Sequence, residues 1–338
     1  MACIFKCQKT LNCNLATFNK SNNDCKYYTD YLTELTRLYQ SNEMYIYKPI
    51  YILKGQQYLN RLISVSIFSL TQLSNKNIAC GLSNGKISIL NYINLSTILT
   101  IDAHLQPVNS LDSLKNGNLV SGSDDSTIKI WNPLSNILIN TLYGHVGSVY
   151  IVKVLQNGDI ASGGQDLIVR IWDSNTGSLK QNLTGHTSLI FAISQFTTVS
   201  IVTADYNCNN KIWNEQNNGT LIHSFNTGFS ESSNYVCNNG DYVAGSRYGS
   251  LRIYDHSNFL LKFNLIGHNE KIFKIIQLDN NDLASCSADK TIKVWDWNTK
   301  QIKYDLNVGH SNFISGVKLL HNGYMVSAGF DGKVIVWK

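Results

Sequence analysis

Residues 144–173 read GHVGSVYIVKVLQNGDIASGGQDLIVRIWD, and the markers in this stretch return along most of the chain. The aromatic residue near its end, Trp172, has counterparts at steps of 41 residues and one final step of 42: Trp131, Trp213, Tyr254, Trp295 and Trp337. One step back from Trp131 reaches Leu90, in a segment of the same pattern. Equal steps of this length predict seven copies of one structural unit.

Two further markers keep the same spacing. A histidine lies 27 residues before the aromatic in five units: His104, His145, His186, His268 and His310. An Asn-Gly pair, such as 157–158, lies 15 residues before it in most units and favours a tight hairpin turn, because both central residues of that turn need positive φ. The intervening segments alternate or are β-branched, as in 149–155 and 168–172. Each unit is therefore predicted to form four short antiparallel strands without a helix.

One four-stranded sheet cannot bury both of its faces alone, so the seven units are predicted to pack radially as a β-propeller. The chain resembles the WD-repeat propeller family in Gly144-His145, Ser162, Asp166 and Trp172-Asp173. The resemblance covers about residues 56–338. It implies an all-β, seven-bladed disc of four-stranded antiparallel blades that binds other proteins and seldom catalyses a reaction.

The chain divides into an N-terminal extension, residues 1–54, and the propeller, residues 55–338. The extension is expected to hold a mobile tail and one amphipathic helix over 24–40, which either packs on the disc or docks a partner. Only one residue follows Trp337, so the last unit lacks a fourth strand of its own. Residues 55–62 align with the fourth-strand segment 177–184 and are predicted to supply it.

Composition excludes several classes of protein. The chain has 43% hydrophobic residues and a formal charge of +5, which argues against disorder, and no apolar run reaches the length of a membrane span. Residues 1–55 hold a charge of +3 and the other 283 residues only +2, so no basic face and no nucleic-acid partner are expected.

The cysteines and the start of the chain indicate where the protein acts. The first residues do not read as a signal peptide, so a cytoplasmic location is expected, with the nucleus as the alternative. The eight cysteines then read as free thiols. The four early ones match no common zinc spacing, and neither a metal nor a cofactor is predicted.

His145, Ser162 and Asp166 are the residue types of a hydrolytic triad, but the set recurs, whereas an active site is built once. The family resemblance implies a structural role, in which Asp holds His, His meets Ser and Ser meets the Trp indole. No catalytic residue is therefore predicted. The four complete sets are His104, Ser121, Asp125, Trp131; His145, Ser162, Asp166, Trp172; His268, Ser285, Asp289, Trp295; and His310, Ser327, Asp331, Trp337.

Three units depart from the pattern. The unit of His186 has Asn207 at the Asp position, with Asp205 displaced by two residues, and the first unit and the unit ending at Tyr254 have no set at all. Three histidines, His223, His256 and His321, lie off the repeat spacing without an evident partner. An enzyme with a site at the channel mouth, the alternative from another functional class, would depend on them.

Residues just after each His and just before each Asp are predicted to face solvent at one end of the disc. Six of them form an arc over four consecutive units: Leu189, Tyr206, Arg247, Lys271, Phe313 and Phe330. Aromatic and Arg side chains are typical of interface hot spots, and an acidic or phosphorylated peptide with an apolar anchor would suit this arc. The predicted function is a protein-interaction scaffold that binds proteins or peptides there. The alternative is the substrate-recognition subunit of a ubiquitin ligase.

Overall fold

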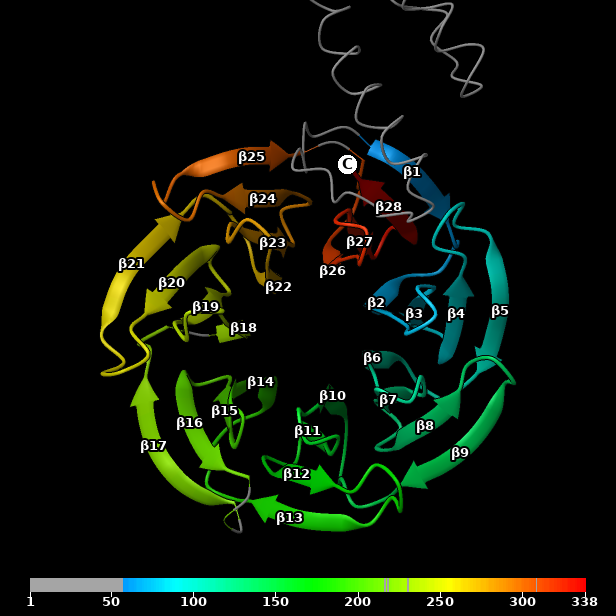
Figure 1. The fold of residues 1–338 in the computed structure, drawn as a ribbon, viewed down its shortest axis with the longest axis horizontal. Coiled ribbons are helices and arrows are strands. Elements are labelled where there is room, and N and C mark those ends of the chain that lie inside the picture. The colour runs from blue at the N-terminus through cyan, green and yellow to red at the C-terminus, as the bar shows by residue number, and fades with distance from the viewer. Residues whose placement is uncertain (1–56, 216, 218, 230, 308) are drawn as a thin grey trace, which may run out of the picture. The chain divides into compact units, whose positions relative to one another are not determined.

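The computed structural model describes residues 57–338, apart from residues 216, 218, 230 and 308. Its 28 strands form seven four-stranded antiparallel sheets around one axis (Figure 1). The predicted seven-bladed propeller of four-stranded blades is confirmed. No described residue is helical, and no described segment forms a helix able to span a membrane. The expected extension 1–54, with its helix 24–40, and residues 55–56 of the expected closing segment lie outside the described residues.

Each blade runs from an innermost to an outermost strand, and the blades are numbered 1 to 7 by their innermost strand. The innermost strands are β2 (Ile67–Gln72), β6 (Val108–Ser113), β10 (Val149–Val154), β14 (Ile190–Thr197), β18 (Glu231–Val236), β22 (Ile272–Gln277) and β26 (Ile314–Leu319). The second strands are β3 (Ile78–Leu82), β7 (Leu119–Ser123), β11 (Ile160–Gly164), β15 (Ser200–Asp205), β19 (Tyr242–Ser246), β23 (Leu283–Ser287) and β27 (Met325–Gly329).

The third strands end at or near the marker residue of each repeat, which is aromatic except for Leu90 in blade 1, and the fourth strands form the rim. The third strands are β4 (Lys86–Leu90), β8 (Ile128–Asn132), β12 (Val169–Trp172), β16 (Asn209–Asn214), β20 (Ser250–Tyr254), β24 (Ile292–Trp295) and β28 (Lys333–Trp337). The outer strands are β5 (Thr97–Asp102), β9 (Ile137–Leu142), β13 (Leu179–Leu183), β17 (Thr220–Asn226), β21 (Leu261–Ile266), β25 (Ile302–Leu306) and β1 (Gln57–Leu62).

The hydrophobic core lies between neighbouring blades rather than inside any one of them. In one such layer, Val149, Ile160 and Trp172 of blade 3 pack against Val120 and Ile128 of blade 2. Every residue of the second strands is buried, because neighbouring strands cover their edges and neighbouring blades cover their faces. The outer strands are mostly exposed. A blade is therefore stable only between two others.

The last blade combines the two ends of the propeller sequence. β1 pairs antiparallel with β28, with Arg61 opposite Val334 and Leu62 opposite Lys333. The Ile63 N–H continues this pairing by donating to the Gly332 carbonyl at 2.8 Å. On the inner side, β26 packs against β2 of the first blade, which closes the ring. The open edge that β28 would otherwise present is thereby covered.

Every innermost strand has a register irregularity between its first and third residues. A bulge of this kind re-aims the side chain of the extra residue. The residues at this second position all line the central channel: Phe68, Asn109, Tyr150, Phe191, Ser232, Phe273 and Ser315. One bulge, repeated seven times, thus sets the shape of the channel.

Truncation tests the role of β1. A chain that starts at residue 63 lacks β1 and leaves the edge of β28 unpaired, and we expect its melting temperature to fall by at least about 5 °C relative to the full chain. A chain that starts at residue 46 retains β1 and should melt close to the full chain. Thermal unfolding followed by circular dichroism measures both. Equal melting temperatures for the two truncated chains would contradict the role given to β1.

Candidate functional site

Five blades contain a hydrogen-bonded set of His, hydroxyl, Asp and Trp. In blade 3, His145 Nδ1 lies 3.0 Å from an Asp166 carboxylate oxygen, and His145 Nε2 lies 2.7 Å from Ser162 Oγ. The Trp172 indole N–H donates to the same Ser162 Oγ at 2.8 Å. The His–hydroxyl distance is 2.7–2.8 Å in the other four blades: His104–Ser121, His186–Thr203, His268–Ser285 and His310–Ser327.

These hydroxyls are not placed as nucleophiles. The Asp beside Nδ1 favours the tautomer with the proton on Nδ1, so that Nε2 accepts from the hydroxyl while the hydroxyl accepts from the indole. Ser162 has no exposed surface, and the same is true of Ser121, Ser285 and Ser327. A substrate cannot reach an oxygen that is buried and already bonded on both sides. Each set therefore joins strands within its blade and satisfies their buried polar groups.

The fifth set corrects the expectation for blade 4. The Asp of this set is Asp205 and not the residue at the expected position, Asn207: an Asp205 carboxylate oxygen lies 3.1 Å from His186 Nδ1. The Thr203 hydroxyl accepts the Trp213 indole N–H at 2.8 Å. Burial alone would raise the pKa of Asp205, but hydrogen bonds from His186 and Asn209 lower it to about 2. Asn207 is exposed.

The Asp of each set also connects two loops on one face of the disc. Asp125, on the turn between the second and third strands, accepts the backbone N–H of Leu105, the residue after His104, at 3.2 Å. Asp166, Asp289 and Asp331 do the same for Val146, Asn269 and Ser311. We call the face that carries these loops the top face. The sets of blades 4, 6 and 7 thus fix the loops that bear five of the six arc residues, all except Arg247 on blade 5.

Blades 4 and 5 share a different buried polar cluster, made by Asn210, Glu231 and Tyr242. One oxygen of Glu231 accepts from Asn210 Nδ2 at 2.7 Å and from the Thr227 hydroxyl, and the other accepts from the Tyr242 hydroxyl at 2.8 Å. Burial raises the pKa of Glu231 to about 7 against the lowering effect of these hydrogen bonds. Blade 5 lacks the His set, as expected, but it has this cluster in its place.

Sequence reasoning missed the cluster, although the repeat contains a signal for it. Glu231 begins its innermost strand, where every other blade has a buried Ile or Val: Ile67, Val108, Val149, Ile190, Ile272 and Ile314. Asn210 and Tyr242 also occupy positions that are apolar in the neighbouring repeats, as at Val169 and Ile201. One polar residue at a normally apolar position would not predict a cluster, but three such residues in neighbouring repeats do.

At the mouth of the channel, cations and aromatic rings of the arc are interleaved. The Arg247 guanidinium lies 4.7 Å from the centroid of the Tyr206 ring. Lys271 Nζ lies 4.6 Å from the Phe273 ring and 5.5 Å from the Phe191 ring. Arg247 and Lys271 form no ion pair with any other described residue, so both charges are available at the mouth.

The arc continues onto blade 7 through ring contacts. Phe313 and Phe330 lie 5.8 Å apart, and Phe273 bridges both at 6.4 and 6.0 Å. Tyr206 and Phe313 are 37% and 40% exposed, so both present ring surface to solvent. Leu189 is half-buried and takes no part in these ring contacts; its carbonyl accepts the Tyr206 N–H at 2.9 Å. The structure therefore brings five of the six predicted residues into one chain of ring and cation contacts.

Four aromatic residues of the mouth were missed from sequence. Tyr150 stacks on Phe191 with ring centroids 4.8 Å apart, and Phe68 stacks on Phe330 at the same distance. Three of the four, Tyr150, Phe191 and Phe273, lie five residues after a marker histidine. The spacing was visible in the sequence. The direction in which these side chains point was not visible in the sequence, because it depends on the bulge.

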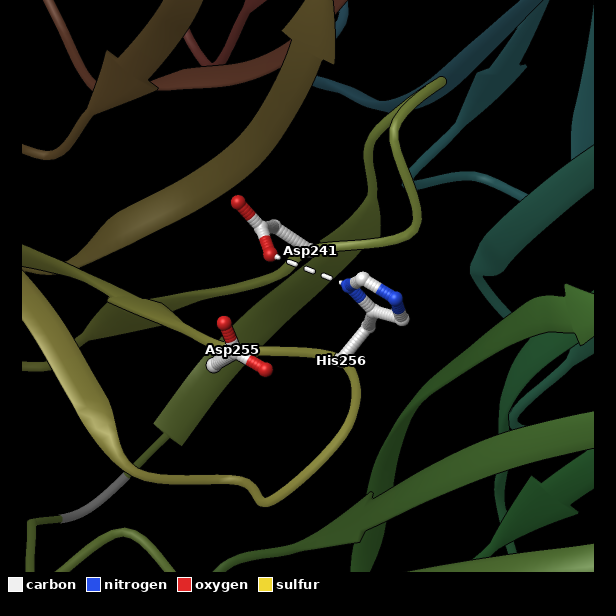
Figure 2. Close-up of side chains that lie close together, drawn as sticks. All are labelled: Asp241, Asp255 and His256. Atoms are coloured by element: carbon white, nitrogen blue, oxygen red, sulfur yellow. Dashed lines mark ion pairs between the residues drawn. The ribbon is translucent and has the colours of Figure 1, made fainter.

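The off-register histidines do have partners. His223 stacks on Phe259 at 4.8 Å, His321 Nδ1 lies 3.0 Å from the Gln72 amide nitrogen, and His256 Nδ1 lies 3.5 Å from Asp241 Oδ1. Figure 2 shows Asp241, Asp255 and His256 turned toward one another, the kind of grouping that can hold a metal ion.

A lysine already supplies positive charge to this grouping. Lys262 Nζ lies 2.9 Å from Asp241 Oδ1 and 2.8 Å from Asp255 Oδ2, and its hydrogen bond lowers the pKa of Asp255. The same Lys between two Asp recurs in blades 3 and 6, around Lys180 and Lys303. We therefore interpret the grouping as a repeated structural feature.

Sequence comparison supports the repeat assignment. The family described as "WD domain, G-beta repeat" matches residues 95–132, 136–173, 259–296 and 302–338. The chain is a WD-repeat propeller. Outside these matches lie the three inner strands of blade 1 and of blade 5, which has Glu231, and all of blade 4, which has the displaced Asp205. WD-repeat propellers are generally non-enzymatic.

Individual relatives share only part of their length with this WD-repeat propeller. A "WD repeat-containing protein 89 homolog" of Dictyostelium discoideum is 35% identical over 96 residues, 28% of this chain and 25% of the relative. "DDB1- and CUL4-associated factor 10" of Danio rerio is 35% identical over 71 residues, 21% of this chain and 14% of the relative. The chain thus matches a quarter or less of these relatives.

A solved structure, "Crystal structure of WD40 beta propeller domain of Doa1", shares the fold. Its TM-score is 0.77 at 19% identity, with 84% of this chain and 96% of the other covered.

The displaced Asp gives a direct test of the hydrogen-bonded sets. Asp205→Ala leaves His186 without its acceptor, and we expect the free energy of unfolding to fall by about 1–3 kcal/mol. Asn207→Ala, at the position that the repeat spacing favours, should change it by less than about 0.5 kcal/mol. Urea unfolding measures both variants. A larger loss of unfolding free energy for Asn207→Ala than for Asp205→Ala would contradict the assignment of Asp205.

The raised pKa of Glu231 gives a pH test. The folded WD-repeat propeller retains a proton on Glu231 up to about pH 7, whereas the unfolded chain loses it near 4.5, so this group favours folding at low pH and ceases to do so as pH rises. Glu231→Gln mimics the protonated acid. Relative to wild type, its free energy of unfolding should rise by up to about 3 kcal/mol between pH 5 and 8.

The exposed Glu270→Gln is the matched control, and its difference from wild type should stay flat over the same range. Urea unfolding at several pH values supplies the comparison. A flat difference for Glu231→Gln as well would show that Glu231 ionises normally in the folded protein.

Proposed function

We propose that this protein is a non-enzymatic interaction scaffold that binds a partner protein or peptide at the channel mouth on the top face. The observation that carries the proposal is the run of contacts in which Arg247 and Lys271 lie against Tyr206, Phe191 and Phe273. Aromatic and Arg side chains at the centre of a contact surface supply most of the binding energy in many interfaces. The blade sheets hold these groups rigidly, which limits the entropy lost on binding.

The charges indicate what the partner offers. Burial, and then the charge of Arg247, lowers the pKa of Lys271 to about 8, so an acidic group placed beside Lys271 would be stabilised. Tyr206 and Phe313 offer ring surface on either side. A peptide with an acidic or phosphorylated residue and an apolar anchor fits this combination. A protein partner is favoured over nucleic acid, because the mouth mixes two cations with rings rather than presenting a row of cations.

Exposed apolar residues extend the apolar surface of the top face beyond the arc. Leu105 and Val146, each directly after a marker histidine, are 90% and 77% exposed. They lie on blades 2 and 3, on the other side of the mouth from Arg247. A partner larger than a short peptide would cover them as well.

The second candidate function is substrate recognition in a ubiquitin ligase. It is supported by the similarity to a protein whose name associates it with DDB1 and CUL4. The match spans 71 residues of repeat sequence and so reports the fold of the blades more directly than a shared partner. Capture of DDB1 by this chain would favour it.

We also propose a cytoplasmic location, with the nucleus as the alternative. The four cysteines among the described residues, Cys80, Cys208, Cys237 and Cys286, are all free thiols. Free thiols suit a reducing compartment.

Affinity capture from cells tests the binding site. The triple variant Tyr206→Ala, Phe313→Ala, Phe330→Ala should lose the partners that the wild-type protein captures, because it removes the ring surface of the mouth. The control is the double variant Ile93→Ala, Leu134→Ala. These residues are 64% and 76% exposed and lie in turns between third and fourth strands, on the face opposite the top face. The control variant should keep the partners. An unchanged set for the triple variant would overturn the site.

A further inference from the structure

The channel between the innermost strands, including its aromatic mouth, is a cavity of about 420 Å³. Its charged lining residues are Asp112, Lys153, Lys271, Lys274 and Lys318, four cations against one carboxylate. The charge count along the sequence suggested no basic cluster. That expectation needs correction, because residues from separate blades converge here.

Three of these residues lie at one level of the channel. Asp112, Lys153 and Lys318 are each the fifth residue of their innermost strand, on blades 2, 3 and 7, and Lys274 is the third residue of β22 on blade 6. With a rise of about 3.3 Å per residue, this level lies roughly 10 Å along the strand from the second-position aromatic residues. Lys153 and Lys318 therefore lie well inside the channel, whereas Lys274 lies about 7 Å nearer the mouth, directly after Phe273.

The single carboxylate is fully engaged. Asp112 Oδ2 lies 3.0 Å from Lys153 Nζ and accepts the Val154 N–H at 2.9 Å, while Oδ1 accepts the Ser113 N–H at 3.0 Å. Lys274 and Lys318 make no ion pair or hydrogen bond with any side chain in the described part of the chain. The group of Asp112 with the three lysines Lys153, Lys274 and Lys318 therefore has two positive charges without a counter-charge.

Electrostatics shows that these groups affect one another across the channel. Lys274 is exposed to the channel, but the surrounding protein removes part of its solvent, and this together with the charges of Lys153 and Lys318 lowers its pKa to about 8. Burial also lowers the pKa of Lys318, in spite of the attraction of Asp112. Holding like charges together in this way costs free energy, and a bound anion would offset that cost.

We propose that the channel binds a compact polyanion of the phosphate class, held by Lys153, Lys274 and Lys318. Phosphate groups match the two uncompensated charges, and lysine binds them as a point charge from several directions. At about 30 Å³ per water molecule, the cavity has the volume of roughly fourteen waters, which admits a short phosphate chain and excludes a nucleic-acid duplex. This proposal does not depend on the partner site at the mouth.

Titration calorimetry with inorganic tripolyphosphate tests the site in the full chain at low salt. We expect one-to-one binding to the wild-type protein. Each lysine lost should weaken binding about tenfold or more, so Lys274→Met with Lys318→Met should weaken it about 100-fold. Lys290→Met, which removes an exposed charge outside the channel lining, should bind like wild type. The triple mouth variant should also bind like wild type, which separates this site from the proposed function.

Thermal unfolding shows whether the double variant folds. Removing two like charges should leave its melting temperature equal to or above that of wild type, and tripolyphosphate should raise the melting temperature of wild type alone. Absence of binding to wild type, or equal binding by the double variant, would overturn the proposal. Hexaglutamate is the comparison ligand. If it bound as tightly and with the same loss in the double variant, the channel would belong to acidic protein segments instead of phosphates.

Discussion

The pairing of β1 with β28, together with the packing of β26 against β2, turns seven similar sheets into one closed ring. Each blade buries its faces only against two neighbours, so the first and last blades are stable together or not at all. Closure also places the seven innermost strands around one channel. The aromatic mouth and the lysines of the channel include residues more than a hundred positions apart in sequence, such as Phe68 and Phe330, and closure is what brings them within reach of one another.

The blades differ in what they contribute to the structure and to the mouth. Blades 2, 3, 6 and 7 keep the regular His, Ser, Asp and Trp set, in which the Asp ties the loop after the His to the turn on the top face. Blades 4 and 5 depart from the repeat, with Asp205 displaced and Glu231 buried between them, and they carry Tyr206 and Arg247 of the mouth. Regular blades thus give rigidity, while the divergent pair contributes the stacked cation. This distribution fits a scaffold whose specificity resides in few positions.

The sequence was sufficient for the seven blades, their four strands and the absence of a helix between them, because a repeated pattern of turns and β-branched segments leaves few alternatives. It was insufficient where position depends on three-dimensional closure. Asp205 reaches His186 from two residues before the expected place, since hydrogen bonding requires a short distance and not a fixed register. Phe191 and Phe273 face the channel because of a bulge that composition does not reveal. Lys153, Lys274 and Lys318 are far apart in sequence and average out in any count of net charge.

The central claim is that partners are bound by the loops around the channel mouth. Hydrogen exchange of the full chain, with and without a captured partner, measures this most directly. The account predicts slower exchange in the top-face loops of blades 4 to 7, around residues 187–191, 206–208, 247–249, 269–273 and 311–313, and little change in the outer strands. Protection confined to the outer strands, or to the turns at the opposite face, would contradict it.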